Sequence, residues 1–179
     1  MRLRDENTLE LFAKRLREGI YTDSKHLTSI LYLFAKFKWR SSQGDDYLQV
    51  ALRHLMNDPG LNSYIASRNL WNLYAFDYYD KVAMDRFANV IMNTEPDKLN
   101  ELDIANAVRS FAHFQFLDYD CLEVLLKQCI RRADNFNMQT LAVVLNSFAE
   151  LDVSNPTLLE ISKQILLKKI DLKATTPDG

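Results

Sequence analysis

Apolar residues recur along this chain with the period of amphipathic helices, and one such helix is repeated. The segment Leu-Phe-Ala-Lys-Phe at 33–37 is followed by similar segments at 73–77, 110–114 and 147–151, each with an aromatic residue before an alanine. The four alanines are Ala35, Ala75, Ala112 and Ala149. Their spacings of 40, 37 and 37 residues indicate four copies of one structural unit.

A second apolar-periodic stretch follows each of these helices. We expect it at about 44–57, 81–93, 118–133 and 155–170. Asn155-Pro156 is a strong helix start, because it combines a capping side chain with a proline at the first helical position, and Asp118 is a second candidate cap. The chain therefore alternates a first and a second helix in every unit.

Such a helix pair is too small to bury its apolar side alone, so the units must stack. The predicted fold class is all-α, an α-solenoid of about four stacked helix-turn-helix repeats of 37–40 residues. It is expected to form one domain over 1–172, followed by a polar tail at 173–179. Its parts are a half-unit at 7–20 and repeats at about 23–57, 64–93, 101–133 and 137–170. We expect each alanine to be the point of close contact between neighbouring units, with the aromatic ring filling the gap.

Composition supports helices and argues against most chemistry. Gly and Pro supply only 4 residues each of 179, too few for a tight-turned β fold or a glycine-rich phosphate loop. The soft or borderline metal ligands, His26, His54, His113, Cys121 and Cys129, form no metal-binding pattern. The cysteines are interpreted as small core residues. We expect no enzyme activity, metal, cofactor, small-molecule substrate or membrane partner.

The polar side of the first helices is the informative surface. At 100° per residue, the positions six and three before each alanine and one after it point away from the apolar side. Asn recurs there although it is a poor helix former. Helical-repeat proteins read single-stranded RNA with amides and Arg at base edges and with rings that stack. The candidate RNA-binding residues are Tyr32, Asn69, Asn72, Phe76, Asn106, Arg109, His113 and Asn146. The alternative is that these Asn are ordinary surface residues and that Tyr32 and Phe76 cover a neighbouring helix.

The Asn side chains favour RNA binding, but the charge distribution along the chain does so much less. The formal net charge is −2, whereas nucleic-acid binding usually draws on a basic excess. Residues 1–40 hold nine basic and five acidic side chains, and residues 41–125 hold six and thirteen. Basic residues gather near the two ends: Arg2, Arg4, Lys14, Arg15, Arg17, Arg131, Arg132, Lys168 and Lys169. An acidic middle fits protein contacts at least as well.

The first helices at 104–114, Ile-Ala-Asn-Ala-Val-Arg-Ser-Phe-Ala-His-Phe, and at 141–153, Leu-Ala-Val-Val-Leu-Asn-Ser-Phe-Ala-Glu-Leu-Asp-Val, carry a resemblance. The αα unit resembles the octotricopeptide and heptatricopeptide repeats, and it is similar to the repeat region of the FAST-kinase-like proteins, which often precedes a RAP domain. The resemblance covers about 9–170. Octotricopeptide repeats often have a Pro-rich start to the second helix, which here only Asn155-Pro156 matches, and no RAP segment follows Leu172.

The resemblance implies an organellar, typically mitochondrial, protein that binds RNA and acts in transcript processing, stability, translation or ribosome assembly. No transit peptide is visible, because the first twenty residues include Asp5, Glu6, Glu10 and Glu18; a cytoplasmic location is the alternative. The expected function is therefore a non-catalytic module that binds single-stranded RNA. The alternative is a scaffold that holds protein partners in a large organellar assembly without contacting RNA.

Overall fold

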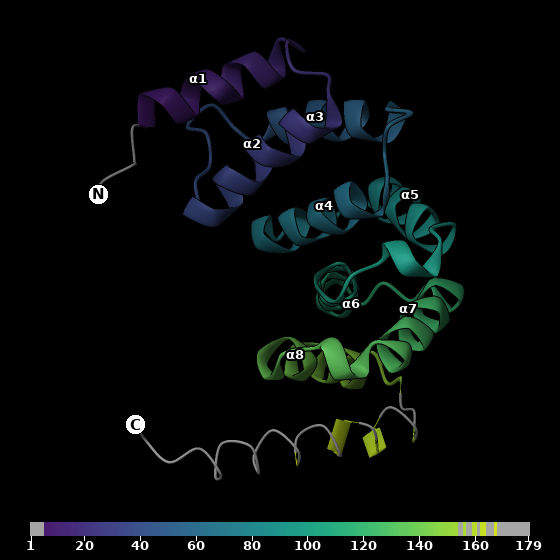
Figure 1. Ribbon diagram of the computed structural model, residues 1–179. Helices are drawn as coiled ribbons and strands as arrows, with labels where there is room; N and C mark the ends of the chain where they lie inside the picture. The colour runs from purple at the N-terminus through teal and green to yellow at the C-terminus, as the bar shows by residue number, and fades with distance from the viewer. Residues whose placement is uncertain (1–5, 154–155, 157–158, 161, 164–166, 168–179) are drawn as a thin grey trace, which may run out of the picture. The chain divides into compact units, whose positions relative to one another are not determined.

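The described part of this computed structural model is all-α (Figure 1). It covers residues 6–153, 156, 159–160, 162–163 and 167, and no strand occurs among them. The chain divides into two compact units, residues 1–94 and 95–179. Each unit is described by itself.

The described part of unit 1, from residue 6 onwards, contains five helices. They are α1 (Glu6–Arg17), α2 (Ser24–Phe37), α3 (Asp46–Asn57), α4 (Ser63–Phe76) and α5 (Lys81–Met92). Helix α1 packs against α3, α3 against α5, and α2 against α4, so each helix contacts the next but one along the chain. Helices α2 and α3, and likewise α4 and α5, also contact each other as sequential pairs. The first helices of the repeats thus pack on first helices, and the second helices on second helices.

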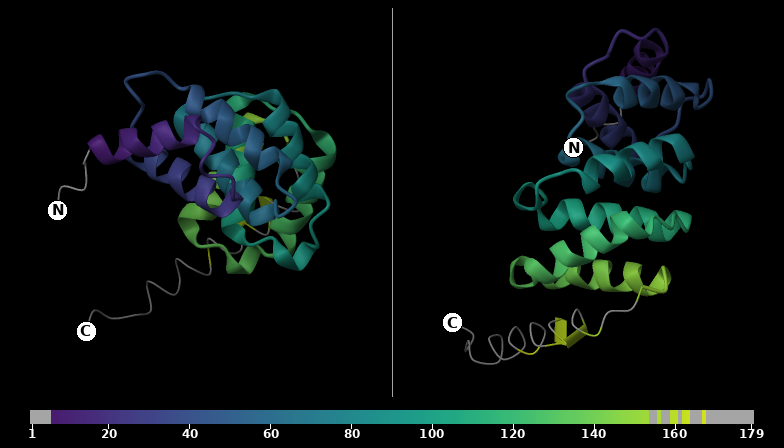
Figure 2. Two further views of the ribbon diagram at one scale, coloured as in Figure 1. Left: turned by 90° about the horizontal axis from the view of Figure 1, so that it is seen from above. Right: turned by 90° about the vertical axis from the view of Figure 1, so that its right-hand side faces the viewer.

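Unit 2 contains three described α-helices and two short 3₁₀ helices. They are η1 (Pro96–Lys98), α6 (Glu101–Phe114), α7 (Tyr119–Arg131), η2 (Ala133–Asn135) and α8 (Met138–Glu150). Helix α6 packs against both α8 and α7, and the three lie next to one another in Figure 1, with two further views in Figure 2. This unit therefore has the same two kinds of helix contact as unit 1.

Asn and Asp side chains begin these helices. Asn62, Asn100 and Asn137 each accept backbone N–H groups at the start of α4, α6 and α8, and Asp23 does so for α2. Asp80 caps α5 in the same way. A side-chain oxygen at this position binds N–H groups that have no partner within the helix, and this typically contributes about 1 kcal/mol.

Each unit has an apolar core that the helical periodicity predicts. In unit 1, Leu27 and Phe34 of α2 and Leu48 of α3 are completely buried, and in unit 2 the same holds for Val108 and Phe111 of α6. The Tyr47 ring lies edge-on to Phe34, with centroids 5.5 Å apart. Burying one such side chain contributes about 2 kcal/mol, so the helix contacts are held mainly by apolar burial.

The predicted helices correspond closely to the observed ones. The expected second helices at 44–57, 81–93 and 118–133 are α3, α5 and α7. Asp118 caps α7 as expected, since its carboxylate accepts the N–H of Cys121 at 3.0 Å. The expected half-unit at 7–20 corresponds to α1, which begins one residue earlier. Asn155 and most of the expected helix at 155–170 lie outside the described residues, as does the tail at 173–179.

Candidate nucleic-acid interface

Helices α2, α4, α6 and α8 are followed by the same backbone motif. In each case one non-glycine residue adopts the left-handed conformation, with φ between 50° and 57°: Lys38, Asp77, Gln115 and Asp152. The next residue donates its N–H back to the carbonyl five positions earlier, as Trp39 does to Phe34 at 2.9 Å and Phe116 to Phe111 at 2.9 Å. This is the Schellman motif, and it gives a structural alignment of the four helices.

The alignment corrects one of the four alanines. Ala35, Ala112 and Ala149 each lie three residues before the left-handed residue, but in α4 that place belongs to Tyr74. Taking Ala75 as the equivalent residue is therefore wrong by one position. Ala35 and Ala112 are buried, whereas Ala75 is half-buried and Ala149 is exposed, so close packing at the alanine stays a prediction for the first two and does not fit Ala149.

A shift of one residue rotates a helical position by about 100°, and this changes which side chains of α4 face solvent. The expectation that Asn69, Asn72 and Phe76 point away from the apolar side is wrong, because they are 0%, 1% and 3% exposed. Their side chains are therefore not accessible to an RNA base. The other first helices keep the predicted orientation.

Asn69 and Asn72 instead form a hydrogen-bonded contact inside unit 1. The Asn69 amide donates to Thr28 Oγ1 of α2 at 2.7 Å and to the Ile65 carbonyl at 2.8 Å. The Asn72 amide donates to Asn69 Oδ1 at 3.1 Å. Thr28 in turn donates to the Ser24 carbonyl at 2.6 Å. These bonds join α2 to α4, so the two amides are structural.

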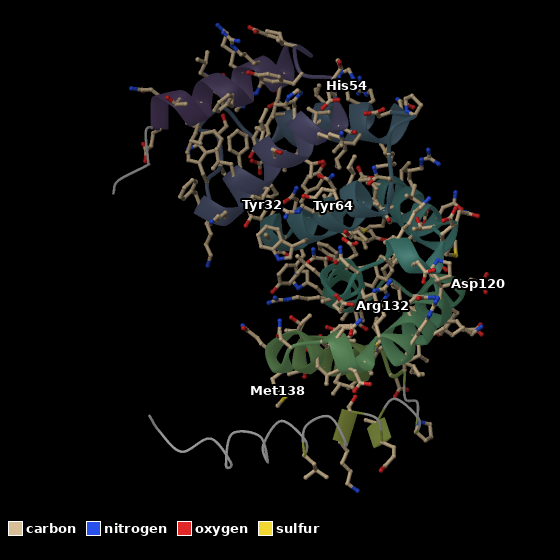
Figure 3. All side chains as sticks on the ribbon, in the orientation of Figure 1. Tyr32, His54, Tyr64, Asp120, Arg132 and Met138 are labelled. Atoms are coloured by element: carbon tan, nitrogen blue, oxygen red, sulfur yellow. The ribbon has the colours of Figure 1, made fainter. Side chains whose placement is uncertain are left out.

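The corrected alignment places Arg68 and Trp71 of α4 where Asn69 and Asn72 were expected. Together with Tyr32, Lys36 and Tyr64 they form what we call the unit 1 face. Tyr32 and Trp71 have ring centroids 5.3 Å apart, and the Arg68 guanidinium carbon lies 5.0 Å from the Tyr32 centroid and 5.2 Å from that of Tyr64. Figure 3 labels both tyrosines. Three rings and a guanidinium thus lie together.

The unit 1 face is open to solvent and carries positive charge. Tyr64 is 50% exposed and Lys36 is exposed, while Tyr32, Arg68 and Trp71 are half-buried. The Lys36 ammonium lies 5.8 Å from the Tyr32 centroid. Rings that are partly buried have their orientation fixed by the helices beneath, and cations above a ring are attracted by its π electrons.

In unit 2, the predicted residues lie where the sequence placed them. Arg109 and His113 on α6 and Asn146 on α8 are exposed, and Asn106 is half-buried. The Asn146 amide donates to Glu150 Oε1 at 2.6 Å. We call Asn106, Arg109, His113 and Asn146 the unit 2 face. It offers amides, an imidazole and a guanidinium rather than stacked rings.

Sequence reasoning missed Arg68, Trp71 and Tyr64, although a signal was present. A polar residue followed by an apolar one ends each first helix, as in Lys38-Trp39, Asp77-Tyr78 and Gln115-Phe116. The apolar residue after the left-handed position packs back on the helix, as Trp39 does on Phe34 with centroids 4.6 Å apart. Aligning these pairs would have given the correct register for α4.

Several of the basic residues near the chain ends are engaged within their own unit. Arg17 donates to Asp46 at 2.6 Å, to Ser41 Oγ at 2.7 Å and to the Gly44 carbonyl at 2.9 Å. The pKa of Asp46 is lowered, chiefly by its hydrogen bond from Arg17. In unit 2, Arg131 pairs with Asp97 and Arg132 with Glu101. Arg2, Arg4, Lys168 and Lys169 lie outside the described residues.

The two cysteines lie in the core of unit 2 and not on its solvent-facing side. Cys121 and Cys129 are buried, as expected for core residues, and burial raises the pKa of each thiol to about 12. Among the described residues, no three His, Cys, Asp or Glu side chains are grouped so that they could hold a metal ion. Every helix in the described part of the chain is too short or too polar to span a membrane.

Neither protein-family models nor curated proteins give a match to this chain.

Proposed function

We propose that this chain is a non-catalytic αα-repeat protein that binds single-stranded RNA along the solvent-facing side of α2, α4, α6 and α8. The helix contacts support stacking within each unit, because α2 packs on α4 in unit 1 and α6 packs on α8 in unit 2.

The unit 1 face carries this proposal. Single-stranded nucleic acids bind to aromatic side chains on which bases stack, with cations nearby for the phosphates. Tyr32, Tyr64 and Trp71 supply the rings, and Arg68 and Lys36 supply the charges. The unit 2 face adds Asn106, Arg109, His113 and Asn146, whose amide and guanidinium groups are suited to base edges.

The resemblance to octotricopeptide repeats and to the FAST-kinase-like repeat region supports an organellar, mitochondrial setting. The function proposed there is RNA processing, stability or ribosome assembly. The formal net charge of −2 gives the chain no basic excess, so the proposal assigns most of the affinity to stacking on the rings of the unit 1 face.

Fluorescence anisotropy with labelled single-stranded RNA at low salt tests the proposal. The double variant Arg68→Ala/Trp71→Ala is expected to weaken binding by about tenfold or more, because each stacked base contributes about 1–3 kcal/mol. The matched control is Tyr79→Ala/Lys81→Ala, which also removes a ring and a cation from exposed positions of unit 1. Equal effects of the two double variants, or no measurable binding by the wild-type protein, would reject the proposal.

A protein scaffold is the second candidate, and exposed apolar side chains between paired helices favour it. Tyr79 and Val82 follow α4, and Leu117 and Tyr119 follow α6, all about half exposed or more. Acidic residues flank them, including Asp80 and Asp120. Partner capture from an organelle extract after ribonuclease treatment separates the two functions. A complex that survives ribonuclease and is lost in Tyr79→Ala or Tyr119→Ala favours the scaffold.

A further inference from the structure

A groove of about 450 Å³ lies in unit 1 between the first turns of α1 and the segment that follows α2. The Phe37 and Trp39 rings line it together with the cations Lys38 and Arg40. Glu6 and Glu10 line it from α1. Its volume is in the range of small-molecule sites, which typically combine aromatic walls with a few polar groups. None of these six residues belongs to the unit 1 face.

The aromatic wall of the groove is held in place by α2 and α3. Trp39 donates its backbone N–H to the Phe34 carbonyl at 2.9 Å, and its ring centroid lies 4.6 Å from that of Phe34 and 6.3 Å from that of Tyr47. Arg40 pairs with Asp45 and donates to the Phe76 carbonyl. The indole is therefore oriented before any ligand arrives, which reduces the entropy cost of stacking a flat ring on it.

Lys38 places a positive charge in the groove, and the equivalent positions of the other first helices carry no such charge. It occupies the left-handed position after α2, where the equivalent residues are Asp77, Gln115 and Asp152. Its side chain is exposed. A flexible ammonium beside an aromatic ring is suited to a phosphate group.

Carboxylates on α1 supply the acceptor side. Glu6 and Glu10 are four residues apart and so lie on the same side of the helix. Glu10 Oε1 accepts a hydrogen bond from Ser41 Oγ, whereas Glu6 is exposed at the rim. An ionised carboxylate accepts two N–H groups at once. Among the four RNA bases, guanine presents two adjacent donors on its Watson–Crick edge, N1–H and the 2-amino group.

We propose that this groove binds a guanine nucleotide, either free or as the end of an RNA strand. The base stacks on Trp39, its Watson–Crick edge donates to the Glu6 carboxylate, and its phosphate binds Lys38. The free-nucleotide part stands on the groove alone, whereas capture of an RNA end rests on the proposed RNA-binding function.

The chain has two tryptophans, so each site can be followed separately. A Trp71→Phe variant leaves Trp39 as the reporter of the groove, and a Trp39→Phe variant leaves Trp71 as the reporter of the unit 1 face. With Trp71→Phe, GMP is expected to quench the fluorescence saturably, and UMP and CMP to bind at least about tenfold more weakly, because a lost pair of hydrogen bonds costs about 1–3 kcal/mol.

Two further substitutions in the Trp71→Phe background identify the groups. Lys38→Gly removes the ammonium but suits the left-handed backbone, so it preserves the fold. It is expected to weaken GMP binding about tenfold, whereas the control Gln115→Gly, at an equivalent position in unit 2, leaves it unchanged. Glu6→Gln is expected to abolish the preference for GMP over AMP. Quenching by GMP that neither Lys38→Gly nor Glu6→Gln alters overturns the site.

RNA added to the Trp39→Phe variant separates this inference from the proposed function. If RNA changes Trp71 fluorescence while GMP leaves Trp39 unchanged in the other variant, the groove inference is wrong and the RNA-binding face stands. If GMP binds and RNA has no effect, the nucleotide site stands and the RNA-binding function is wrong. If neither responds, both are rejected. Capture of an RNA end is tested by competition with GMP. It is supported if an oligonucleotide with a 5′-phosphorylated terminal guanosine competes and one with a terminal uridine does not.

Discussion

Helices α4 and α6 have the same length and similar sequences, yet their Asn residues have opposite environments. Asn69 and Asn72 of α4 are buried against α2, whereas Asn106 of α6 is half-buried and Arg109 is exposed. The difference is a shift of one residue between the alanine and the left-handed position that ends the helix. The capping motif, and not the aromatic-alanine pair, therefore indicates which side of a first helix faces solvent.

The largest expected effect that separates the two helices is on stability. Asn69→Ala should lower the free energy of unfolding by about 2 kcal/mol, because it removes the bond to Thr28 Oγ1 and the shorter of two bonds from the buried Asn72 amide, which keeps the one to the Thr28 carbonyl at 3.4 Å. Asn106 lies six residues before Ala112, as Asn69 lies six before Ala75, and Asn106→Ala should change the free energy of unfolding by less than about 0.5 kcal/mol. Urea unfolding followed by far-UV circular dichroism measures both, and similar values would contradict the assignment.

A second pair of variants tests where α4 ends. Asp77→Gly should stabilise the protein by about 0.5–1 kcal/mol, because glycine adopts a positive φ at low cost. Tyr78→Gly should destabilise it by about 2 kcal/mol, because it removes a half-buried ring next to the motif. Thermal unfolding gives the sign of each change. Stabilisation by Tyr78→Gly with destabilisation by Asp77→Gly would place the left-handed residue one position later.

The salt dependence of RNA binding compares the two faces. The two faces contain three cations, Lys36, Arg68 and Arg109, and each can neutralise one phosphate. About 0.7 counterions are released for each phosphate of a single strand that is neutralised. The logarithm of the binding constant should therefore fall with the logarithm of the salt concentration at a slope of about −2. Arg68→Ala or Arg109→Ala should each reduce the slope by about 0.7. A steep slope that neither variant changes would show that RNA binds elsewhere on the chain.

The pH dependence of stability should differ between the two units, by less than the effects above. The pKa of Asp58 is lowered from its ordinary 3.8, chiefly by its hydrogen bond from Ser24 at the start of α2. Since the folded pKa is the lower one, the ionised carboxylate stabilises unit 1 above about pH 3.8 and this contribution disappears as the pH falls through the folded value.

Asp58→Asn should therefore be less stable than the wild-type protein at neutral pH and similar to it in strong acid. The control is Glu123→Gln in unit 2, whose pKa is lowered chiefly by the hydrogen bond from Lys127 on the same helix and whose effect on stability should be weaker. Tryptophan fluorescence follows the unfolding of unit 1, which contains Trp39 and Trp71, and far-UV circular dichroism follows the Glu123→Gln control in unit 2. A gap for Asp58→Asn that widens in acid would contradict the sign.

Periodicity was sufficient to predict the helices, and much less so the site. An amphipathic pattern depends on many residues, so α2 to α8 were placed within a few positions. Which side of α4 faces out depends on a single residue of register, and Tyr74-Ala75 resembles the aromatic-alanine pairs of the other repeats. The pairing of Asn69 with Thr28 joins residues 41 positions apart and leaves no local signal. The groove beside Trp39 was missed for the same reason, since it combines α1 with the segment after α2.

The reactivity of cysteines introduced into α4 and α6 tests the assigned orientation most directly. The two native thiols are buried, with pKa values raised to about 12, and should stay silent towards a thiol reagent at neutral pH. Arg109→Cys, at an exposed position, should react at close to the unfolded-chain rate, and Arg68→Cys, at a half-buried one, somewhat more slowly. Asn69→Cys should be slower than Arg109→Cys by a factor on the order of 100, because it reacts only when the helix opens. Faster labelling of Asn69→Cys than of Arg68→Cys would contradict the account.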